Sequence, residues 1–354
     1  FYNNILNYIK KNHKKYYCIK NYENRGESMG IFSKPEVIVL KESSDATNYL
    51  AKLEELLSKT DGELQKKIQK EIAITKAGII GEENVLFELR NSNMDMVVLQ
   101  DIYLETKDGL GAQIDFIVVT PKVAFVIECK NLFGNIEIDS NGNFVRTMEY
   151  GGRKYKEGIY SPITQNERHL EVLKEVKTEG KNFLVGASIR NSFKCYYKSL
   201  VVLANPKTIL NDKYAKKETK NQVLRADQII HVMKKMNSES KEMSSSKKEM
   251  IAIAERIWNK NKEERKDYST KFQELLDQNE TEKLKESVVC ENIQEIIPLA
   301  NETKEKMICP SCGSELILRT AKKGVNVGQQ FYGCTNYPRC RFIVNLCKDE
   351  YRNN

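Results

Sequence analysis

The sequence predicts an α/β domain with a mixed central sheet and flanking helices, preceded by a helical hairpin and followed by a small cysteine-rich β module. Two apolar runs, residues 113–119 and 123–130, flank a turn at Pro121, which is typical of a hairpin of buried strands. Leucine and isoleucine recur at helical spacing between residues 50 and 72. Cysteines crowd the end of the chain from Cys309 onward.

The central hairpin is expected to bring charged side chains together. With residues 121 and 122 as the turn, the strand register places Asp115 opposite Glu128. Opposed residues have Cβ atoms about 4.5–5.5 Å apart, so two carboxylates there repel each other. Side chains alternate along a strand, so Lys130 shares a face with Glu128. Two carboxylates and an ammonium at the end of an apolar hairpin predict a site for a divalent cation.

A solvated ion pair at a strand end is the simpler interpretation of Glu128 and Lys130. The apolar character of both strands away from these positions favours a functional site instead. The chain has three histidines, so a metal here would have oxygen ligands, which favours Mg²⁺ or Mn²⁺ over zinc. We therefore predict that Asp115 and Glu128 bind Mg²⁺ or Mn²⁺.

The composition indicates a chain of 354 residues with polar linkers and no membrane segment. Charged residues make up 30% of the chain, and mean hydropathy is −0.56. The apolar runs fall far short of the about 20 residues that cross a bilayer, and no secretory signal is visible. Scattered single cysteines then suggest a reducing compartment, so the expected location is the cytoplasm.

Positive charge is concentrated at the two ends of the chain. The formal net charge is +8, of which residues 1–28 contribute +4 and residues 306–354 contribute +5, leaving −1 for the rest. An anionic partner such as nucleic acid would therefore meet the C-terminal module first.

The first part of the chain is expected to be accessory to the core. Residues 1–28 show no period and are expected to be a disordered or non-native leader, with translation beginning at Met29. Residues 29–77 are expected to form an N-terminal helical segment. A separate helix is predicted over residues 82–90, with Glu82 in its first turn. Favourable placement near a helix N-terminus explains Glu82 as well as a catalytic role does.

The elements after the central hairpin complete the predicted core, which spans residues 78–236. A strand at residues 97–104 precedes that hairpin, and a second hairpin at 135–150 turns at Asn141-Gly142. A helix over residues 164–177 carries Gln165 and His169 on one face, for which a solvated polar face is the simpler explanation. The remaining expected elements are a loop at 151–160, strands at 183–188 and 200–204, a helix at 226–235, and a charged helical linker at 237–305.

Residues 306–347 are expected to form a module folded around zinc. Cys309 and Cys312 form a CxxC pair, and Cys334 and Cys340 follow after 21 residues. Four thiolates at such spacing suit a structural tetrahedral Zn²⁺. Cys347 is a less favoured alternative ligand, and a disulfide is disfavoured in a chain without an export signal.

An ordered set of short motifs carries a family resemblance. The motifs are Gly81-Glu82, Gln113-Ile114-Asp115, Ile127-Glu128-Cys129-Lys130-Asn131 with Gly134, and Pro162 with Gln165. In this order they resemble the nuclease-related domain, NERD, of the PD-(D/E)XK superfamily, over about residues 78–205. The resemblance implies a restriction-endonuclease-like core in which Asp115 and Glu128 hold metal, Lys130 assists at the scissile phosphate, Glu82 adds a carboxylate and Gln165 positions substrate. Cys129 stands where family members often have Thr, on the face away from the metal.

A second resemblance covers about residues 307–346. The run from Phe331 to Cys340 resembles the C-terminal zinc ribbon of type IA DNA topoisomerases, which implies binding of single-stranded DNA. Aromatic and basic side chains together suit base stacking beside a phosphate backbone. The candidate DNA contacts are Phe331, Tyr332, Tyr337, Arg339 and Arg341. The alternative is that these aromatics fill the small core of the ribbon.

These features predict a cytoplasmic, metal-dependent DNA nuclease that acts in DNA processing or repair. A different class stays open: a DNA-binding or adaptor protein whose nuclease-like core is inactive. The joint presence of Asp115, Glu128 and Lys130 argues against that class, because a degenerate site usually loses one of its residues. RNA as the substrate is disfavoured only by the topoisomerase resemblance.

Overall fold

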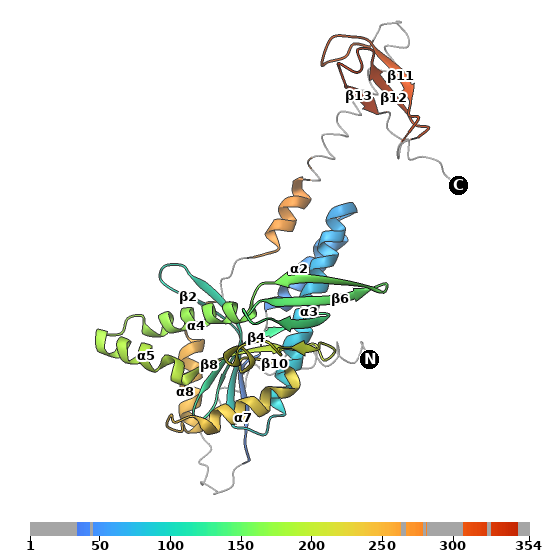
Figure 1. Cartoon of the computed structure of the whole chain (residues 1–354). Coiled ribbons are helices and arrows are strands. Elements are labelled where there is room, and N and C mark those ends of the chain that lie inside the picture. The colour runs from blue at the N-terminus through green and yellow to red at the C-terminus, as the bar shows by residue number, and fades with distance from the viewer. Residues whose placement is uncertain are drawn as a thin grey trace. The chain divides into compact units, whose positions relative to one another are not determined.

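The computed structural model describes residues 34–42, 45–262, 267–278, 281, 307–323 and 327–345. Figure 1 shows the described helices and strands. By its internal contacts the chain divides into two compact units. Among the described residues, the first unit comprises those up to Thr47 and residues 75–262, and the second comprises residues 48–74 and those from 267 onward. The expected leader at residues 1–28 and the alternative ligand Cys347 lie outside the described residues.

A six-stranded mixed sheet forms the centre of the first unit. Its strands in order are β1 (Val37–Lys41), β2 (Met96–Glu105), β3 (Gly111–Val119), β4 (Ala124–Lys130), β8 (Tyr197–Leu203) and β10 (Val223–Arg225). Strands β2, β3 and β4 pair antiparallel, whereas β1 pairs parallel to β2, and β4, β8 and β10 run parallel. The mixed sheet is therefore as the sequence predicts.

Helices cover both faces of this sheet. On one face, α4 (Pro162–Thr178), α5 (Phe183–Tyr196) and α8 (Lys247–Trp258) pack on one buried apolar cluster. On the other, the C-terminal part of α3 (Gly62–Arg90) and α7 (Ile229–Glu239) pack on a second cluster. Burial of both faces explains why the central strands read as continuous apolar runs. The predicted α/β architecture is confirmed.

A second, four-stranded sheet lies beside the first and has the order β7-β6-β5-β9. Its strands are β5 (Asn135–Ile138), β6 (Phe144–Tyr150), β7 (Arg153–Ile159) and β9 (Leu210–Asn211). Residues 151–160 were expected as a loop, and this expectation is wrong because they contain β7. The glycines at 151 and 152 have φ of +56° and +74°, which suits the two-residue turn of a tight hairpin.

Two helices differ from the expectation. The strand expected at residues 183–188 is the start of α5, and the Asn182 side chain caps this helix by accepting the Val185 N–H at 2.9 Å. Helix α3 runs without a break from Gly62 to Arg90, so Glu82 lies deep within it and not in a first turn. Favourable placement near a helix N-terminus therefore does not explain Glu82.

Helix α8 lies within the segment expected as a charged linker, residues 237–305, and packs on the core. Met250, Ala254 and Ile257 of α8 are buried in the cluster on the α4 face of the main sheet. Ser246 starts this helix through a capping box with Glu249. Helix α8 thus belongs to the core, because its apolar stripe is buried there.

The second unit contains the expected helical pair and the cysteine module. Helix α2 (Asp45–Ser58) and the N-terminal part of α3 share an apolar cluster with Phe272 and Leu276. The module forms its own three-stranded antiparallel sheet of β11 (Leu316–Thr320), β12 (Gln330–Cys334) and β13 (Ile343–Asn345). Within the described residues, the structure contains no helix long and apolar enough to pass through a bilayer.

Two glycines of α3 should respond oppositely to substitution by alanine. A Cβ on Gly81 would lie 2.6 Å from the Asn131 Cβ, whereas a Cβ on Gly78 meets nothing within 4 Å. We expect Gly78→Ala to stabilise the protein by up to about 1 kcal/mol, because alanine is the better helix former. We expect Gly81→Ala to destabilise it by about 1–2 kcal/mol through overpacking. Denaturant unfolding of both variants tests this, and equal behaviour would contradict the close approach of α3 to the end of β4.

Candidate active site and zinc centre

The central hairpin has the predicted register. Strand pairs from Phe116 with Ile127 to Val119 with Ala124 are antiparallel, and continuing this register places Asp115 opposite Glu128. A carboxylate oxygen of Asp115 accepts the backbone N–H of Cys129 at 2.7 Å. This hydrogen bond holds Asp115 against the last residues of β4, beside Glu128.

Glu128 is the most enclosed member of the site, with a relative exposure of 2%. The Lys130 ammonium lies 2.6 Å from Glu128 Oε1 and donates a hydrogen bond to Gln165 Oε1 at 3.0 Å. The other carboxylate oxygen, Oε2, lies 3.3 Å from His169 Nδ1, yet neither atom has a hydrogen-bond partner. Glu128, Lys130, Gln165 and His169 therefore form one contiguous group.

Helix α4 is fixed over the sheet by a residue that the sequence does not single out. The Asn166 side chain is fully buried and donates to the carbonyl oxygen of Val126 at 2.8 Å and to that of Leu200 at 3.1 Å. It thereby ties α4 to both β4 and β8. This anchor holds Gln165 and His169 over the end of β4. The sequence motifs placed Gln165 in the candidate site, and the structure adds His169.

Glu82 reaches the site from the helix on the other face. Its carboxylate accepts a hydrogen bond from Gln100 Nε2 at 2.9 Å, and its charge raises the pKa of Glu128. Gly81 allows this position, because α3 lies against Cys129 and Asn131. Glu82 thus acts on Glu128 through its charge.

Asp101 is a further acidic residue that sequence reasoning missed. It is buried in β2 with a φ of +55°, a conformation that residues with a Cβ seldom adopt. Gln113 Nε2 donates to its carboxylate at 2.9 Å, and the Lys41 ammonium lies 3.7 Å away. Its charge raises the pKa of Asp115. The signal available in the sequence was the polar pair Gln100-Asp101 inside an otherwise apolar strand.

Burial and like charge shift the titration of the site. Desolvation raises the pKa of Asp115 to about 6, against an ordinary 3.8. Desolvation and the nearby Asp115 carboxylate raise the pKa of Glu128 to about 8, against an ordinary 4.5. Desolvation and the Lys130 charge lower the pKa of His169 to about 4, so its imidazole is neutral near pH 7. The carboxylates are thus a pair whose joint ionisation is costly without a cation.

The donor set suits a hard divalent cation. Carboxylate oxygens are the ligands that Mg²⁺ and Mn²⁺ prefer, and Glu128 Oε2 is a buried oxygen without a hydrogen-bond partner. These carboxylates are less tightly gathered than the cysteines. In the described part of the chain, only the four cysteines bring three or more ligand atoms within 4.8 Å of one another.

The raised carboxylate pKa values predict how stability depends on pH. Between the ordinary values near 4 and the folded values of about 6 and 8, the folded protein binds more protons than the unfolded chain. The free energy of unfolding without added divalent metal should therefore fall as the pH rises toward 8. Thermal unfolding from pH 5 to pH 8.5 tests this. Glu128→Gln should flatten the dependence, and an unchanged slope in that variant would contradict the assignment.

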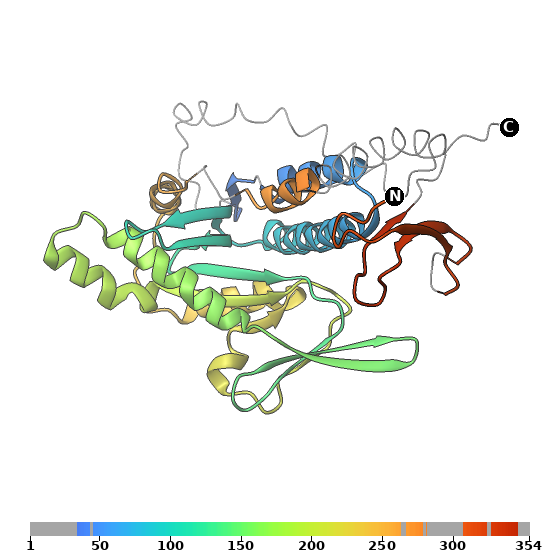
Figure 2. The ribbon, with the colours of Figure 1, turned by 90° about the horizontal axis from the view of Figure 1, so that it is seen from above.

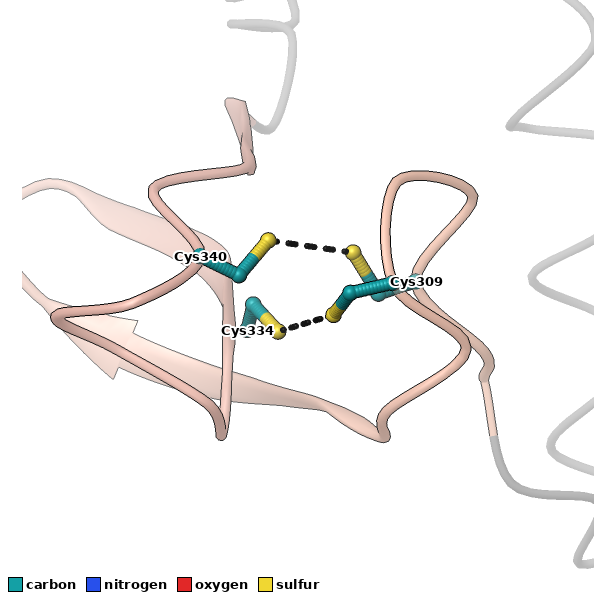
Figure 3. A group of neighbouring side chains, drawn as sticks. Cys309, Cys334 and Cys340 are labelled. Carbon is teal, nitrogen blue, oxygen red and sulfur yellow. Dashed lines mark hydrogen bonds between the residues drawn. The ribbon is translucent and has the colours of Figure 1, made fainter.

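The four predicted cysteines converge in the second unit (Figure 3). The Sγ atoms of Cys309 and Cys340 lie 3.7 Å apart, and those of Cys312 and Cys334 lie 3.4 Å apart. Thiolates around a tetrahedral zinc at about 2.3 Å stand about 3.8 Å from one another. A disulfide would need about 2.05 Å. The cysteine group therefore fits a structural zinc ion.

The candidate DNA contacts divide between the ribbon core and its surface. Tyr332 is half-buried and packs on the cluster that contains Cys309, Cys334 and Cys340. Tyr337 is 63% exposed, and Arg339 and Arg341 are also exposed. Phe331 is half-buried and pairs with Arg319 on the adjacent strand. Tyr332 thus helps to fill the core of the ribbon. Tyr337, Arg339 and Arg341 remain accessible on its surface.

Comparison with known proteins agrees with this two-part organisation. Residues 77–204 match the family described as nuclease-related domain, NERD. Residues 306–349 match the family described as topoisomerase DNA binding C4 zinc finger. One segment of the chain is thus similar to the nuclease-related domain and another to a topoisomerase-type C4 zinc ribbon, as the sequence motifs predict.

Individual relatives share short segments with this chain. DNA topoisomerase 1 of Methanocaldococcus jannaschii is 38% identical over 68 residues, which cover 19% of this chain and 8% of the relative. DNA topoisomerase 1 of Archaeoglobus fulgidus is 44% identical over 45 residues, which cover 12% and 6%. An uncharacterized protein of Haemophilus influenzae is 33% identical over 54 residues, covering 15% and 28%. The chain thus spans less than a tenth of either topoisomerase. No solved structure matches the chain.

Proposed function

We propose that this protein is a metal-dependent nuclease that hydrolyses phosphodiester bonds in DNA. The observation that carries the proposal is the group formed by Asp115, Glu128 and Lys130 at the end of one hairpin, with Gln165 against Lys130. Its position within the match to the nuclease-related domain supports the same reaction.

Asp115 and Glu128 are the residues that would hold Mg²⁺ or Mn²⁺. Such a cation lowers the pKa of water and stabilises negative charge on a phosphate. Lys130 is 26% exposed at its side chain, so its ammonium can turn from Glu128 to donate to a phosphate oxygen. Gln165 holds the ammonium in place by accepting a hydrogen bond at its Oε1. Glu82 and Asp101 add negative charge that favours cation binding.

The zinc ribbon would bind DNA on the same polypeptide that carries the candidate nuclease site. Its likeness to a DNA-binding C4 zinc finger supports DNA as the ligand, and the exposed Tyr337, Arg339 and Arg341 suit a single strand. Zinc-bound thiolates and free cysteines such as Cys195 suit the reducing cytoplasm. A role in DNA processing or repair follows from this combination of hydrolysis with strand binding.

One observation favours a second candidate, a DNA-binding or adaptor protein with an inactive core. The Lys130 ammonium neutralises Glu128 directly at 2.6 Å, which leaves one charge fewer to attract a cation. In this candidate the ion pair would replace the metal, and the ribbon alone would carry the function.

A cleavage panel separates the two candidates. End-labelled single-stranded DNA, duplex DNA, branched DNA and RNA would each be incubated with the purified chain and Mg²⁺ or Mn²⁺. Cleavage of DNA that requires the added metal supports the nuclease. Binding without cleavage of any substrate supports the adaptor, and preferential cleavage of RNA would contradict DNA as the substrate.

A further inference from the structure

Three aromatic side chains form an exposed cluster in the first unit, which does not contain the zinc ribbon. Phe133, Tyr150 and Tyr155 are 52%, 56% and 49% exposed. The ring centroids of Phe133 and Tyr150 are 5.5 Å apart, and those of Tyr150 and Tyr155 are 6.4 Å apart. The two tyrosines lie on the β6–β7 hairpin, which projects as a two-stranded ribbon in both views (Figures 1 and 2).

The register assigns the cluster to one face of the hairpin. Tyr150 pairs with Arg153, and Met148 pairs with Tyr155. Directly paired residues point to the same side, and alternate residues along a strand do so as well. Tyr150, Tyr155 and Arg153 therefore share one face, which continues inward to Phe144 in the buried cluster beneath the second sheet.

This face lies on the same side of the main sheet as the candidate active site. The buried cluster beneath the second sheet includes Val201 and Leu203 of β8. In the parallel pairing of β4 with β8, Val201 stands beside Glu128 and Leu203 beside Lys130. Phe133 follows Lys130 by three positions, in the loop after β4. The aromatic cluster thus begins where the chain leaves the site.

The charge of the hairpin limits the kind of partner. Residues 144–159 contain four basic and two acidic side chains, a net charge of +2. The ion pair of Arg146 with Glu157 uses one charge of each sign. Arg153 lies exposed at the tip on the aromatic face, and Lys154 lies exposed beside it. A partner for this surface must offer flat apolar groups to the rings and negative charge to Arg153.

We infer that the Phe133–Tyr150–Tyr155 face is a second nucleic-acid-binding surface, which holds the bases of a single strand extending from the active site. Unpaired bases stack on aromatic rings irrespective of sequence, and the backbone phosphates meet Arg153. The inference rests on the proposed function, because it names the path of the substrate strand at that site. It makes the core, and not only the ribbon, a DNA-binding part of the chain.

Photocrosslinking in the full chain tests this surface directly. The probe is a single-stranded oligonucleotide with 5-iodouracil, irradiated with the protein in buffer free of Mg²⁺ and Mn²⁺, and the crosslinked peptides are mapped by mass spectrometry. We expect crosslinks at Tyr150 or Tyr155. The double change Tyr150→Ala and Tyr155→Ala should lower the yield on the core at least about fivefold, since stacking contributes substantially per base. A competitor oligonucleotide with abasic sites in place of the nucleotides beside each iodouracil should lower the crosslinking yield less than an intact competitor does.

Tyr214 provides the matched control, being 64% exposed in the same unit with the Lys213 ammonium 5.4 Å from its ring centroid. Tyr214→Ala should leave the crosslinking pattern unchanged. Crosslinks confined to the ribbon, or equal crosslinking at Tyr214, would overturn the inference, as would binding of this face to lipid vesicles in preference to DNA. The crosslinking experiment does not depend on cleavage. Crosslinks at Tyr150 in a protein that does not cleave DNA would therefore refute the proposed nuclease activity but support the proposed binding surface.

Discussion

Glu128→Gln is expected to abolish metal-dependent cleavage, lowering it by at least about a hundredfold, the scale set by loss of a charge-stabilising group. Glutamine preserves the size of the side chain but removes the charge from the ligand set. The variant should also lose the rise in melting temperature that Mg²⁺ or Mn²⁺ gives the wild type through preferential binding to the folded state. Cleavage rates and thermal unfolding with and without metal measure both effects.

The metal-free stability of this variant distinguishes a lost ligand from damaged packing. Glu128 is buried beside Asp115, and the charge of each raises the cost of ionising the other. Glu128→Gln should therefore be as stable as the wild type without metal, or slightly more stable near pH 8. Glu167→Gln, a change at an exposed position of α4, is the matched control and should behave as the wild type. A large loss of metal-free stability would show that Glu128 has a structural role instead.

Lys130→Ala should separate binding of the cation from the chemical step. Removing the ammonium frees Glu128 Oε1 from its ion pair, so the metal-induced rise in melting temperature should persist or increase. Cleavage should fail, because the contact with the phosphate is lost. Wild-type cleavage rates in both this variant and Glu128→Gln would favour the adaptor.

Cys334→Ser is expected to unfold the zinc ribbon and leave the first unit folded. A module of about 40 residues buries too little apolar surface to be stable without a metal or another crosslink. Desolvation raises the pKa of Cys334 to about 12, whereas hydrogen bonds from Ser314 lower that of Cys312 to about 6. Zinc itself would hold both as thiolates. Zinc content should fall from one ion per chain toward none, and DNA binding should weaken.

The control for this change is Cys195→Ser, which alters an exposed cysteine of α5. It should leave zinc content and DNA affinity unchanged. Zinc content per chain can be measured by atomic emission spectroscopy. Folding of the ribbon can be followed by the dispersion of its amide resonances in an NMR spectrum. Full zinc content in Cys334→Ser would show that another residue completes the ligand set.

Local patterns sufficed to predict which main residues lie together in the two candidate sites. The turn at Pro121 and the alternation of side chains fix the register of Asp115 against Glu128, and the cysteine spacing predicts the four thiols that converge. Both signals act over a few residues of contiguous chain, where period and turn chemistry dominate. The family motifs then added Glu82 and Gln165, which neither period nor spacing brings to the site.

Tertiary packing decided the features that the sequence left unpredicted. A separate helix was expected at residues 82–90, yet α3 runs unbroken through Gly78 and Gly81. Its close packing against the end of β4 leaves no room for a side chain at Gly81. The apolar run at residues 183–188 is too short for its period to separate strand from helix. Asp101 and Asn166 gained their positions from contacts with distant strands, on which single-sequence patterns carry no information.

The measurement that tests the central claim most directly is cleavage of labelled DNA by the wild-type chain as Mg²⁺ or Mn²⁺ is added, with zinc retained. Lys130→Ala, assayed in parallel at the same metal concentration, provides the matched control. The proposed site predicts cleavage that rises with added metal in the wild type and stays at background in Lys130→Ala. DNA binding by a folded, zinc-loaded wild type without any metal-dependent cleavage of single-stranded, duplex or branched DNA would contradict it.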